Sequence, residues 1–252
     1  MKSIDAVKRA IVIGATSGIG REVARLLAAD GWKVGVAGRR LDLLQSLQSE
    51  FDEGQVVTAE LDVTLPESVN QLHSLIERLG GMDLFFLSSG VGSQNVLLDS
   101  QIELGTVKTN CEGFVRMLIC AYDYFKIHAT FDRRGHVAVI SSIAGTKGLG
   151  VAPAYSATKR FQNTYVEALN QLANMEHLAI DFTDIRPGFV ATPLLSNKRY
   201  PMLMKADFVA QSIVKALYKR KRVCVIDIRY RLLVLCWKLI PNWIWIRLKV
   251  KN

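Results

Sequence analysis

Three residues in the middle of the chain have side chains that could exchange a proton with a substrate oxygen. Tyr155 and Lys159 are four residues apart, so a helix would place both side chains on one face. Ser142 stands thirteen residues before the tyrosine, at the end of an apolar run. A strand end, a loop and a helix start can therefore bring a hydroxyl, a phenol and an ammonium together.

The chemistry of this set follows from its pKa values. A free tyrosine has a pKa of about 10, which is too high for ready proton exchange at neutral pH. An ammonium one helical turn away favours the phenolate, so we expect Lys159 to lower the pKa of Tyr155. The phenol could then exchange a proton with a substrate oxygen that Ser142 holds. Such a set suits interconversion of a carbonyl and an alcohol, provided that a hydride carrier is present.

A Tyr-x-x-x-Lys pattern also arises by chance in helices, with the tyrosine packed and the lysine in solvent, so the rest of the chain must decide. Near the N-terminus, an apolar run predicts a buried strand, and helical periodicity begins at Arg21. The turn between them contains Gly14, Thr16, Ser17, Gly18, Ile19 and Gly20. Glycines let the backbone approach a pyrophosphate, and a helix N-terminus offers N–H groups. This junction predicts a nucleotide-binding turn rather than a purely structural one.

The end of the second expected strand indicates which nucleotide is bound. An NAD site would have an acidic residue near this point to hold the ribose 2′-hydroxyl. Here Gly38 is followed by Arg39 and Arg40, whose guanidinium groups suit a 2′-phosphate. The alternative is two solvated surface arginines. The glycine turn before them favours the phosphate interpretation and therefore NADP(H) over NAD(H).

Apolar runs alternate with segments of helical periodicity along the chain, which predicts an α/β fold. The expected strands are 10–14, 33–37, 56–61, 84–87, 137–140, 180–185 and 223–226. The expected helices begin at 21 and at 64 or 66, and also span 103–125, 155–174 and 207–218. Continuously apolar strands are buried on both faces. We therefore predict a single-domain Rossmann fold, with a doubly wound, seven-stranded parallel sheet flanked by helices.

Composition limits the classes of protein to be considered. The chain has 252 residues, half of them apolar, which suits one large domain. Its four cysteines show no metal-binding spacing and the N-terminus shows no apolar signal segment, so we expect no metal and a cytoplasmic protein. Residues 198–252 contain 14 Lys/Arg and 2 Asp/Glu, a net charge of +12, against +9 for the whole chain. No recognition module accompanies these bases, so nucleic-acid binding is not expected.

Taken together, residues 8–228 resemble the short-chain dehydrogenase/reductase family in its single-domain branch. The motifs that carry the resemblance, in the order and spacing of the family, are GATSGIG at 14–20, Asp62-Val63, Asn110, Ser142, YSATK at 155–159 and RPGFVAT at 186–192. One motif departs from the family, which usually has Asn-Asn-Ala-Gly after the fourth strand. Here Leu87-Ser88-Ser89-Gly90 stands in its place. Gly90 still lets the backbone approach a cofactor, and Ser88 could replace the asparagine bonds in part.

The resemblance implies a role for each matching residue. Ser142 is expected to bind the substrate oxygen, Tyr155 to act as the acid or base, and Lys159 to lower the tyrosine pKa and bind ribose hydroxyls. Asn110 is expected to kink its helix and hold a water of a proton relay. The remaining cofactor contacts that the family pattern implies are the glycine turn, Asp62 and Val63 at the adenine, Gly90, and a nicotinamide loop of Pro187, Gly188, Val190 and Thr192.

The predicted function is therefore NADPH-dependent reduction of a carbonyl compound by a homodimer or homotetramer. A dinucleotide-binding regulator or scaffold without turnover is the alternative. The segment 193–206 is expected to cover the substrate, and its leucines and methionines indicate a small apolar carbonyl or alcohol. Whether the ligand is a lipid-like ketone, an acyl chain or a sterol stays open.

Residues 1–228 form the expected catalytic domain, and residues 229–252 form an apolar and basic extension beyond the family pattern. Lys238, Pro241 and Asn242 interrupt the apolar run, so a membrane span, which needs about 20 apolar residues, is not expected. Two short helices at an interface fit better. They could make peripheral contact with the inner face of a membrane, cover the substrate cleft or pack on a partner subunit.

Overall fold

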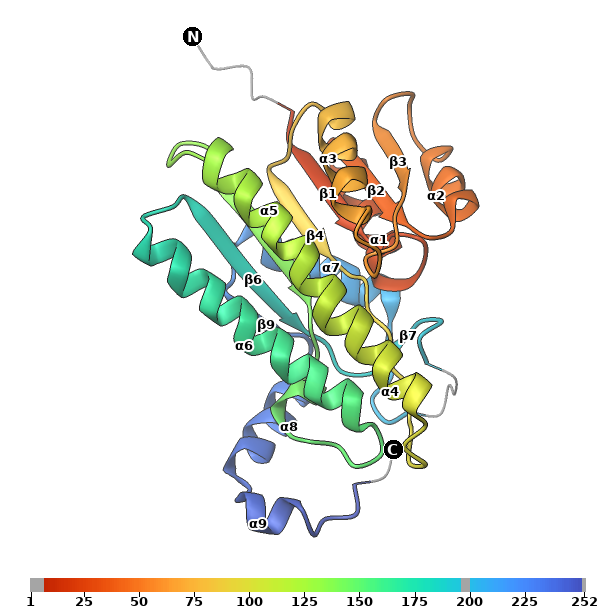
Figure 1. Ribbon diagram of the computed structural model, residues 1–252, viewed down its shortest axis with the longest axis vertical. Helices are drawn as coiled ribbons and strands as arrows, with labels where there is room; N and C mark the ends of the chain where they lie inside the picture. Colours follow the sequence, from red (N-terminus) through yellow and green to blue (C-terminus); the bar gives the residue numbers. More distant parts are fainter. Residues whose placement is uncertain (1–6, 196–199, 251–252) are drawn as a thin grey trace.

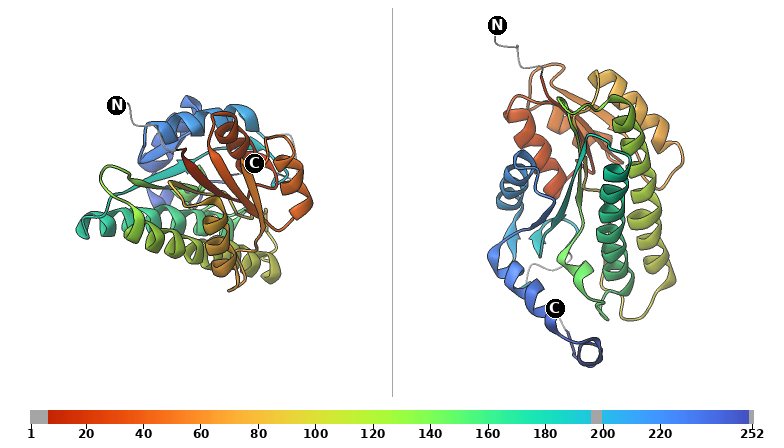
Figure 2. Two further views of the ribbon diagram at one scale, coloured as in Figure 1. Left: turned by 90° about the horizontal axis from the view of Figure 1, so that it is seen from above. Right: turned by 90° about the vertical axis from the view of Figure 1, so that its left-hand side faces the viewer.

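The computed structural model describes residues 7–195 and 200–250 and shows a parallel sheet between two layers of helices (Figures 1 and 2). Seven strands lie in the order β3-β2-β1-β4-β5-β6-β9, and all their pairings are parallel. They are β1 Arg9–Ile13, β2 Lys33–Gly38, β3 Val56–Glu60, β4 Leu84–Leu87, β5 Gly135–Ile140, β6 Ile180–Arg186 and β9 Val223–Val225. The doubly wound α/β fold predicted from the sequence is confirmed.

The two faces of the sheet bury separate apolar clusters. Helices α1 Gly18–Ala29 and α7 Ala206–Tyr218 cover one face, and α3 Ser68–Leu79, α5 Phe114–His128 and α6 Pro153–Met175 cover the other. The central strands β1 and β4 are buried on both sides, so their sequences are nearly continuous apolar runs and not alternating ones.

Two elements differ from the sequence-based expectation. Helix α2, Leu41–Gln48, lies between the second and third strands, where no helix was predicted; it is short and buries only two of its leucines. The single helix expected over 103–125 is instead α4 Ser100–Val107, a π-helical turn Lys108–Gly113, and α5. The helix starts earlier because the Asp99 carboxylate caps it, accepting from the amides of Gln101 and Ile102 at 2.9 and 3.3 Å.

The C-terminal extension forms the two short helices that the sequence predicts, α8 Ile228–Leu239 and α9 Asn242–Trp245. Tyr230 and Val234 of α8 belong to the same apolar cluster as α1 and α7. A second, two-stranded sheet pairs β7 Val190–Ala191 with β8 Met204–Lys205. Across residues 7–195 and 200–250, no helix has the length and apolar character needed to cross a membrane.

The chain order reverses between β1 and β4, since β2 lies to one side of β1 and β4 to the other. In parallel sheets such a reversal leaves a crevice at the carboxyl ends of the strands, where ligands bind. The glycine turn follows β1, the Ser88–Gly90 segment follows β4, and Ser142 follows β5. The predicted site segments therefore lie together at the carboxyl ends of the strands (Figure 1).

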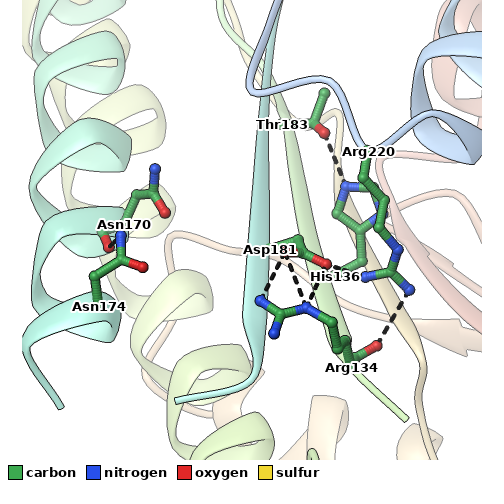
Figure 3. Close-up of polar contacts among 7 residues, drawn as sticks. All are labelled: Arg134, His136, Asn170, Asn174, Asp181, Thr183 and Arg220. Atoms are coloured by element: carbon green, nitrogen blue, oxygen red, sulfur yellow. Dashed lines mark hydrogen bonds and ion pairs between the residues drawn. The ribbon is translucent and has the colours of Figure 1, made fainter. Parts of the chain in front are cut away.

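A polar cluster that includes the buried His136 and Thr183 lies toward the amino ends of β5 and β6 (Figure 3). His136 Nε2 lies 2.8 Å from Thr183 Oγ1. Beside them, the guanidinium groups of Arg134 and Arg220 both donate to the carboxylate of Asp181. Burial lowers the pKa of His136 from 6.5 to about 4, and the nearby charge of Arg220 adds to this effect. The histidine is therefore neutral in the folded protein at physiological pH.

This lowered pKa predicts a loss of stability in mild acid. Between pH 6.5 and 4 the unfolded chain binds a proton at His136 more readily than the folded one, so up to about 3 kcal/mol of stability is lost as the pH falls through this window. Urea unfolding at several pH values should show a flatter curve for His136→Gln than for the natural protein. His128→Gln, at an exposed position, is the control. Equal slopes in all three proteins would contradict the assignment.

Candidate functional site

The glycine turn after β1 depends on two close backbone approaches. A Cβ on Gly20 would lie 2.3 Å from the carbonyl oxygen of Gly14, so the turn folds tightly only without a side chain there. Gly14 has φ +89° and Gly18 has φ +59°, a region that favours glycine. Helix α1 begins at Gly18 with no side-chain cap. The amides of its first turn therefore face the space above β1, as an anion-binding turn requires.

Arg40 is held beside this turn. Its Nη2 donates to Thr16 Oγ1 at 2.8 Å and to Ser17 Oγ at 3.1 Å. A Cβ on Gly38 would lie 2.7 Å from Thr16 Cγ2, so the missing side chain lets the end of β2 approach the turn. A cation therefore stands next to the helix start, where the sequence predicts a phosphate. Arg39 is exposed at the same strand end.

The segment after β3 is fixed by side-chain contacts. Asp62 Oδ1 accepts from the amide and the hydroxyl of Thr64, both at 2.9 Å. The carbonyl oxygen of Val63 accepts from Arg116 Nη1 at 2.7 Å. The amide of Leu61 donates to the carbonyl of Gly38 at 3.0 Å, so this segment is tied to the strand end that carries Arg39 and Arg40.

Asn110 is fully buried in the π-helical turn Lys108–Gly113, which lies between α4 and α5 where the sequence predicts one helix with a kink. Its Oδ1 accepts from the amide of Val91 at 2.9 Å, and its Nδ2 donates to the carbonyl of Val91 at 2.7 Å and to Thr158 Oγ1 at 3.1 Å. These bonds link α6 to the loop after β4. In that loop, Ser88 makes only backbone hydrogen bonds to described residues, so the replacement of the family's asparagine bonds expected from it is not seen.

Ser142, Tyr155 and Lys159 meet at the carboxyl end of β5. The Ser142 hydroxyl accepts from the amide of Ala144 at 3.0 Å. It is close enough to Tyr155 to act on the pKa of the phenol. Lys159 Nζ lies 5.7 Å from the centroid of the tyrosine ring. A Cβ on Gly92 would lie 2.2 Å from Tyr155 Cδ2, so the loop after β4 packs directly on the ring.

Burial sets the pKa values of this set, and one expectation is corrected here. The pKa of Tyr155 is raised because the phenol is removed from solvent, and the Ser142 hydroxyl opposes that rise only in part. The pKa of Tyr155 therefore lies above its ordinary value, whereas the spacing to Lys159 predicts a value below it. Burial also lowers the pKa of Lys159, from 10.5 to about 8, although the nearby Asp184 carboxylate raises it.

Gln162 completes this network and was not predicted from the sequence. Its Oε1 accepts from Lys159 Nζ at 2.9 Å, and its Nε2 donates to the carbonyl of Asn110 at 2.9 Å. Lys159 Nζ also donates to the carbonyl of Ile140 at 3.1 Å. The carbonyl of Asn110, the residue expected to hold a relay water, therefore accepts from a side chain. The only sequence signal was the spacing of Gln162, three residues after Lys159 on one helix.

A second buried group behind the lysine was also missed. Asp184, which is 2% exposed, accepts from the Ser141 hydroxyl, from Asn163 Nδ2 at 3.0 Å and from Arg186 Nε at 2.7 Å. Donors from α6, from the end of β5 and from its own strand β6 thus satisfy one carboxylate, which keeps the negative charge near Lys159. The sequence of β6, Ile-Asp-Phe-Thr-Asp-Ile-Arg, gives no pattern from which these partners could be inferred.

The loop after β6 closes the site. The carbonyl of Pro187 accepts from the amide of Ile143 at 3.1 Å, and the hydroxyl of Ser142 lies 3.5 Å from it. Val190 is buried in β7. A Cβ on Gly18 would lie 3.1 Å from Thr192 Cγ2, so the loop reaches the glycine turn. The predicted residues of this loop therefore lie next to the glycine turn and next to Ser142.

Known proteins resemble this chain in sequence. The sequence model of the family described as "short chain dehydrogenase" matches residues 8–202. The chain belongs to this family. A curated "Uncharacterized oxidoreductase" of Myxococcus xanthus is 34% identical over 200 residues, which is 77% of each protein. Membership of this family establishes that the protein is an NAD(P)-binding oxidoreductase that acts on CH-OH or carbonyl groups.

Solved structures show the same fold. A 3-ketoacyl-(acyl-carrier-protein) reductase from Brucella melitensis, complexed with NADH, superposes with a TM-score of 0.78 at 21% identity, covering 87% of this chain and 96% of that one. An alcohol dehydrogenase from Thermococcus sibiricus, complexed with 5-hydroxy-NADP, has a TM-score of 0.75 at 27% identity, with coverage of 87% and 95%.

The position of Gln162 predicts opposite effects of two substitutions on Lys159. Gln162→Leu removes an acceptor from a buried ammonium and should lower the Lys159 pKa by about one to two units, whereas Gln162→Glu adds a carboxylate and should raise it. NMR titration of protein labelled with ¹³C-lysine measures this pKa, and Lys159→Met assigns the signal. Gln48→Leu, which removes a bond to Val56 far from the site, is the control. Shifts of the same sign in both Gln162 variants would contradict the contact.

Proposed function

We propose that this chain is an NADPH-dependent reductase that converts an apolar ketone into a secondary alcohol. The observation that carries the proposal is the meeting of Ser142, Tyr155 and Lys159 beside the glycine turn after β1. The alternative, a dinucleotide-binding regulator without turnover, gives no reason for a phenol, a hydroxyl and a buried ammonium to gather there.

The roles of the residues follow from their chemistry. Bound NADPH would supply the hydride. Ser142 holds the substrate oxygen, and Tyr155 donates a proton to it as negative charge develops. With its pKa raised, the phenol of Tyr155 carries its proton at neutral pH, as the donor in a reduction must. Lys159 binds ribose hydroxyls, and its charge stabilises the phenolate that proton transfer leaves behind.

The glycine turn fits a dinucleotide, because the close packing of Gly20 on Gly14 leaves the first turn of α1 open to a pyrophosphate. Arg40, held by Thr16 and Ser17, supports a preference for the 2′-phosphate of NADPH. Asp62 and Val63 would contact the adenine, with Gly90 along the cofactor. Pro187, Gly188, Val190 and Thr192 would hold the nicotinamide.

The substrate class rests on the segment after Thr192. Leu194 and Met202 lie in it, and Tyr200 stacks on Phe189 with ring centroids 4.6 Å apart. Residues 196–199 of the predicted substrate cover lie outside the described residues. These apolar side chains support an apolar carbonyl compound as the substrate.

We also propose a cytoplasmic homodimer or homotetramer. Exposed apolar side chains on the outer helices support self-association: Leu104, Val107, Ile119, Phe161 and Leu172 on α4, α5 and α6. Nucleic acid is not among the proposed partners. We propose peripheral membrane contact through residues 229–252 as well.

Replacing the proton donor tests the reductase. Tyr155→Phe keeps the ring but removes the proton, so the rate of ketone-dependent NADPH oxidation should fall by about 10²–10⁴. NADPH affinity, measured by fluorescence titration, should change little. An active Tyr155→Phe protein would contradict the role of the phenol. A natural protein that binds NADPH but turns over no ketone in a broad panel would favour the regulator.

The arginines test the cofactor preference. Arg39→Ala combined with Arg40→Ala removes the charge beside Thr16 and should weaken NADPH about ten- to a hundredfold while NADH binding changes little. Titrations with both cofactors measure this ratio. Arg25→Ala, which removes a cation of α1 paired with Glu22, is the control. An equal loss for NADPH and NADH would mean that these arginines do not contact the 2′-phosphate.

A further inference from the structure

The inner face of α8 is bonded to the loop that closes the site. Tyr230 is fully buried, and its hydroxyl accepts from the amide of Phe189 at 3.0 Å. The same hydroxyl lies 3.1 Å from the carbonyl of Met202 and 3.2 Å from that of Pro201. A Cβ on Gly188 would lie 2.1 Å from Tyr230 Cζ, so the ring covers the backbone of this loop. Helix α8, the first half of the extension, therefore packs against the loop that closes the candidate site.

The second half is bonded to the loop before the catalytic helix. Lys147 Nζ donates to the carbonyl of Ile240 at 2.9 Å and to Asn242 Oδ1 at 2.8 Å. Trp245 Nε1 donates to the carbonyl of Gly148 at 2.7 Å. The extension thus joins the loop that leads to Tyr155 and the loop that follows β6. The extension lies at the end of the molecule that contains the carboxyl ends of the strands and the candidate site (Figure 2).

The outer face of the extension is apolar. Ile228, Leu232, Leu235 and Leu239 recur at the spacing of one face of α8, opposite Tyr230. Their exposed fractions lie between 56 and 75%. Trp243 and Ile246 continue this surface beyond α8, with exposed fractions of 64 and 76%. We call these six residues the outer face.

A second exposed apolar segment borders the same loop. Val96, Leu97 and Leu98 are between 63 and 91% exposed. The preceding residue, Asn95, donates its amide to the carbonyl of Val151 at 2.8 Å, only three residues beyond the Gly148 carbonyl that Trp245 binds. Exposed apolar side chains therefore stand on both sides of the loop that leads into the catalytic helix.

The charge of the extension identifies what covers this surface. Residues 228–250 contain five Lys/Arg and no Asp/Glu. An apolar helix face with tryptophan and flanking cations suits the boundary of an anionic bilayer, where the apolar side chains enter the lipid and the cations meet the headgroups. We propose that the outer face, together with Val96–Leu98, docks the protein on an anionic lipid surface and turns the substrate entrance toward it.

One consequence rests on the proposed function. If the protein reduces an apolar ketone, the substrate enters from the bilayer between the two apolar segments, past the loops that α8 and α9 hold. Docking itself needs neither the cofactor nor turnover. The two can therefore fail separately, because vesicle binding is measured without NADPH and activity is measured on a short soluble ketone without vesicles.

Co-sedimentation with vesicles tests the docking. The natural protein should bind phosphatidylcholine vesicles that contain phosphatidylserine at low salt, and binding should weaken at high salt because the electrostatic part is screened. Combining Leu235→Ser, Leu239→Ser and Trp243→Ser should weaken binding on the order of a hundredfold. The matched control combines Ile127→Ser, Phe131→Ser and Met175→Ser, which replace side chains of similar exposure near the amino ends of the strands. This control should bind like the natural protein.

A charge variant and a fluorescence signal separate the electrostatic and the apolar contributions to vesicle binding. Lys238→Gln combined with Lys249→Gln should weaken binding about five-fold per lysine and reduce the salt dependence. The emission of exposed Trp243 should shift to the blue on anionic vesicles, and Trp243→Phe should remove that shift. NADPH affinity, unchanged in every variant, shows that the fold is intact.

Three results would overturn the proposal. The first is no binding to anionic vesicles at low salt. The second is an equal loss of binding in the outer-face triple variant and in its matched control. The third is a lower oligomer mass of the outer-face triple variant by light scattering with unchanged vesicle binding, which would assign the outer face to contact between copies of the chain.

Discussion

The buried ammonium of Lys159 is the constraint on which the rest of the site depends. Removing an ammonium from water costs several kcal/mol unless acceptors replace the solvent. The protein supplies the carbonyl of Ile140 and the amide of Gln162, with the carboxylate of Asp184 nearby. These groups come from β5, α6 and β6, so the lysine fixes α6 against two neighbouring strands of the sheet. The same burial that demands these partners also raises the tyrosine pKa.

Close approach of backbone is the second constraint, and it explains why the loops around the site are rich in glycine. A side chain at Gly92 would enter the ring of Tyr155, and one at Gly145 would lie 2.3 Å from Asn163 Oδ1. The glycines let two loops lie against α6. The phenol of Tyr155 is thereby held by packing, which limits the positions that a substrate oxygen could take.

The sequence predicts those parts of the structure that depend on local patterns. Buried parallel strands are apolar runs, and the tight turn at Gly14–Gly20 needs glycines, so both could be found without a structure. Helix α2 could not, since two buried leucines in eight residues give little periodicity. The roles of Gln162 and Asp184 depend on partners distant in sequence. The effect of Lys159 on Tyr155 was misjudged because spacing indicates proximity but not burial.

The contact between Tyr230 and Gly188 has a consequence for how this protein can evolve. The ring occupies the volume that a side chain at 188 would need, and its hydroxyl satisfies the amide of Phe189. A larger residue at 188 would have to be accompanied by a smaller one at 230, and loss of the tyrosine would leave a buried amide unsatisfied. In descendants of this gene the two positions should therefore covary. The extension is thus coupled by packing to the loop that follows β6 and is not an independent module.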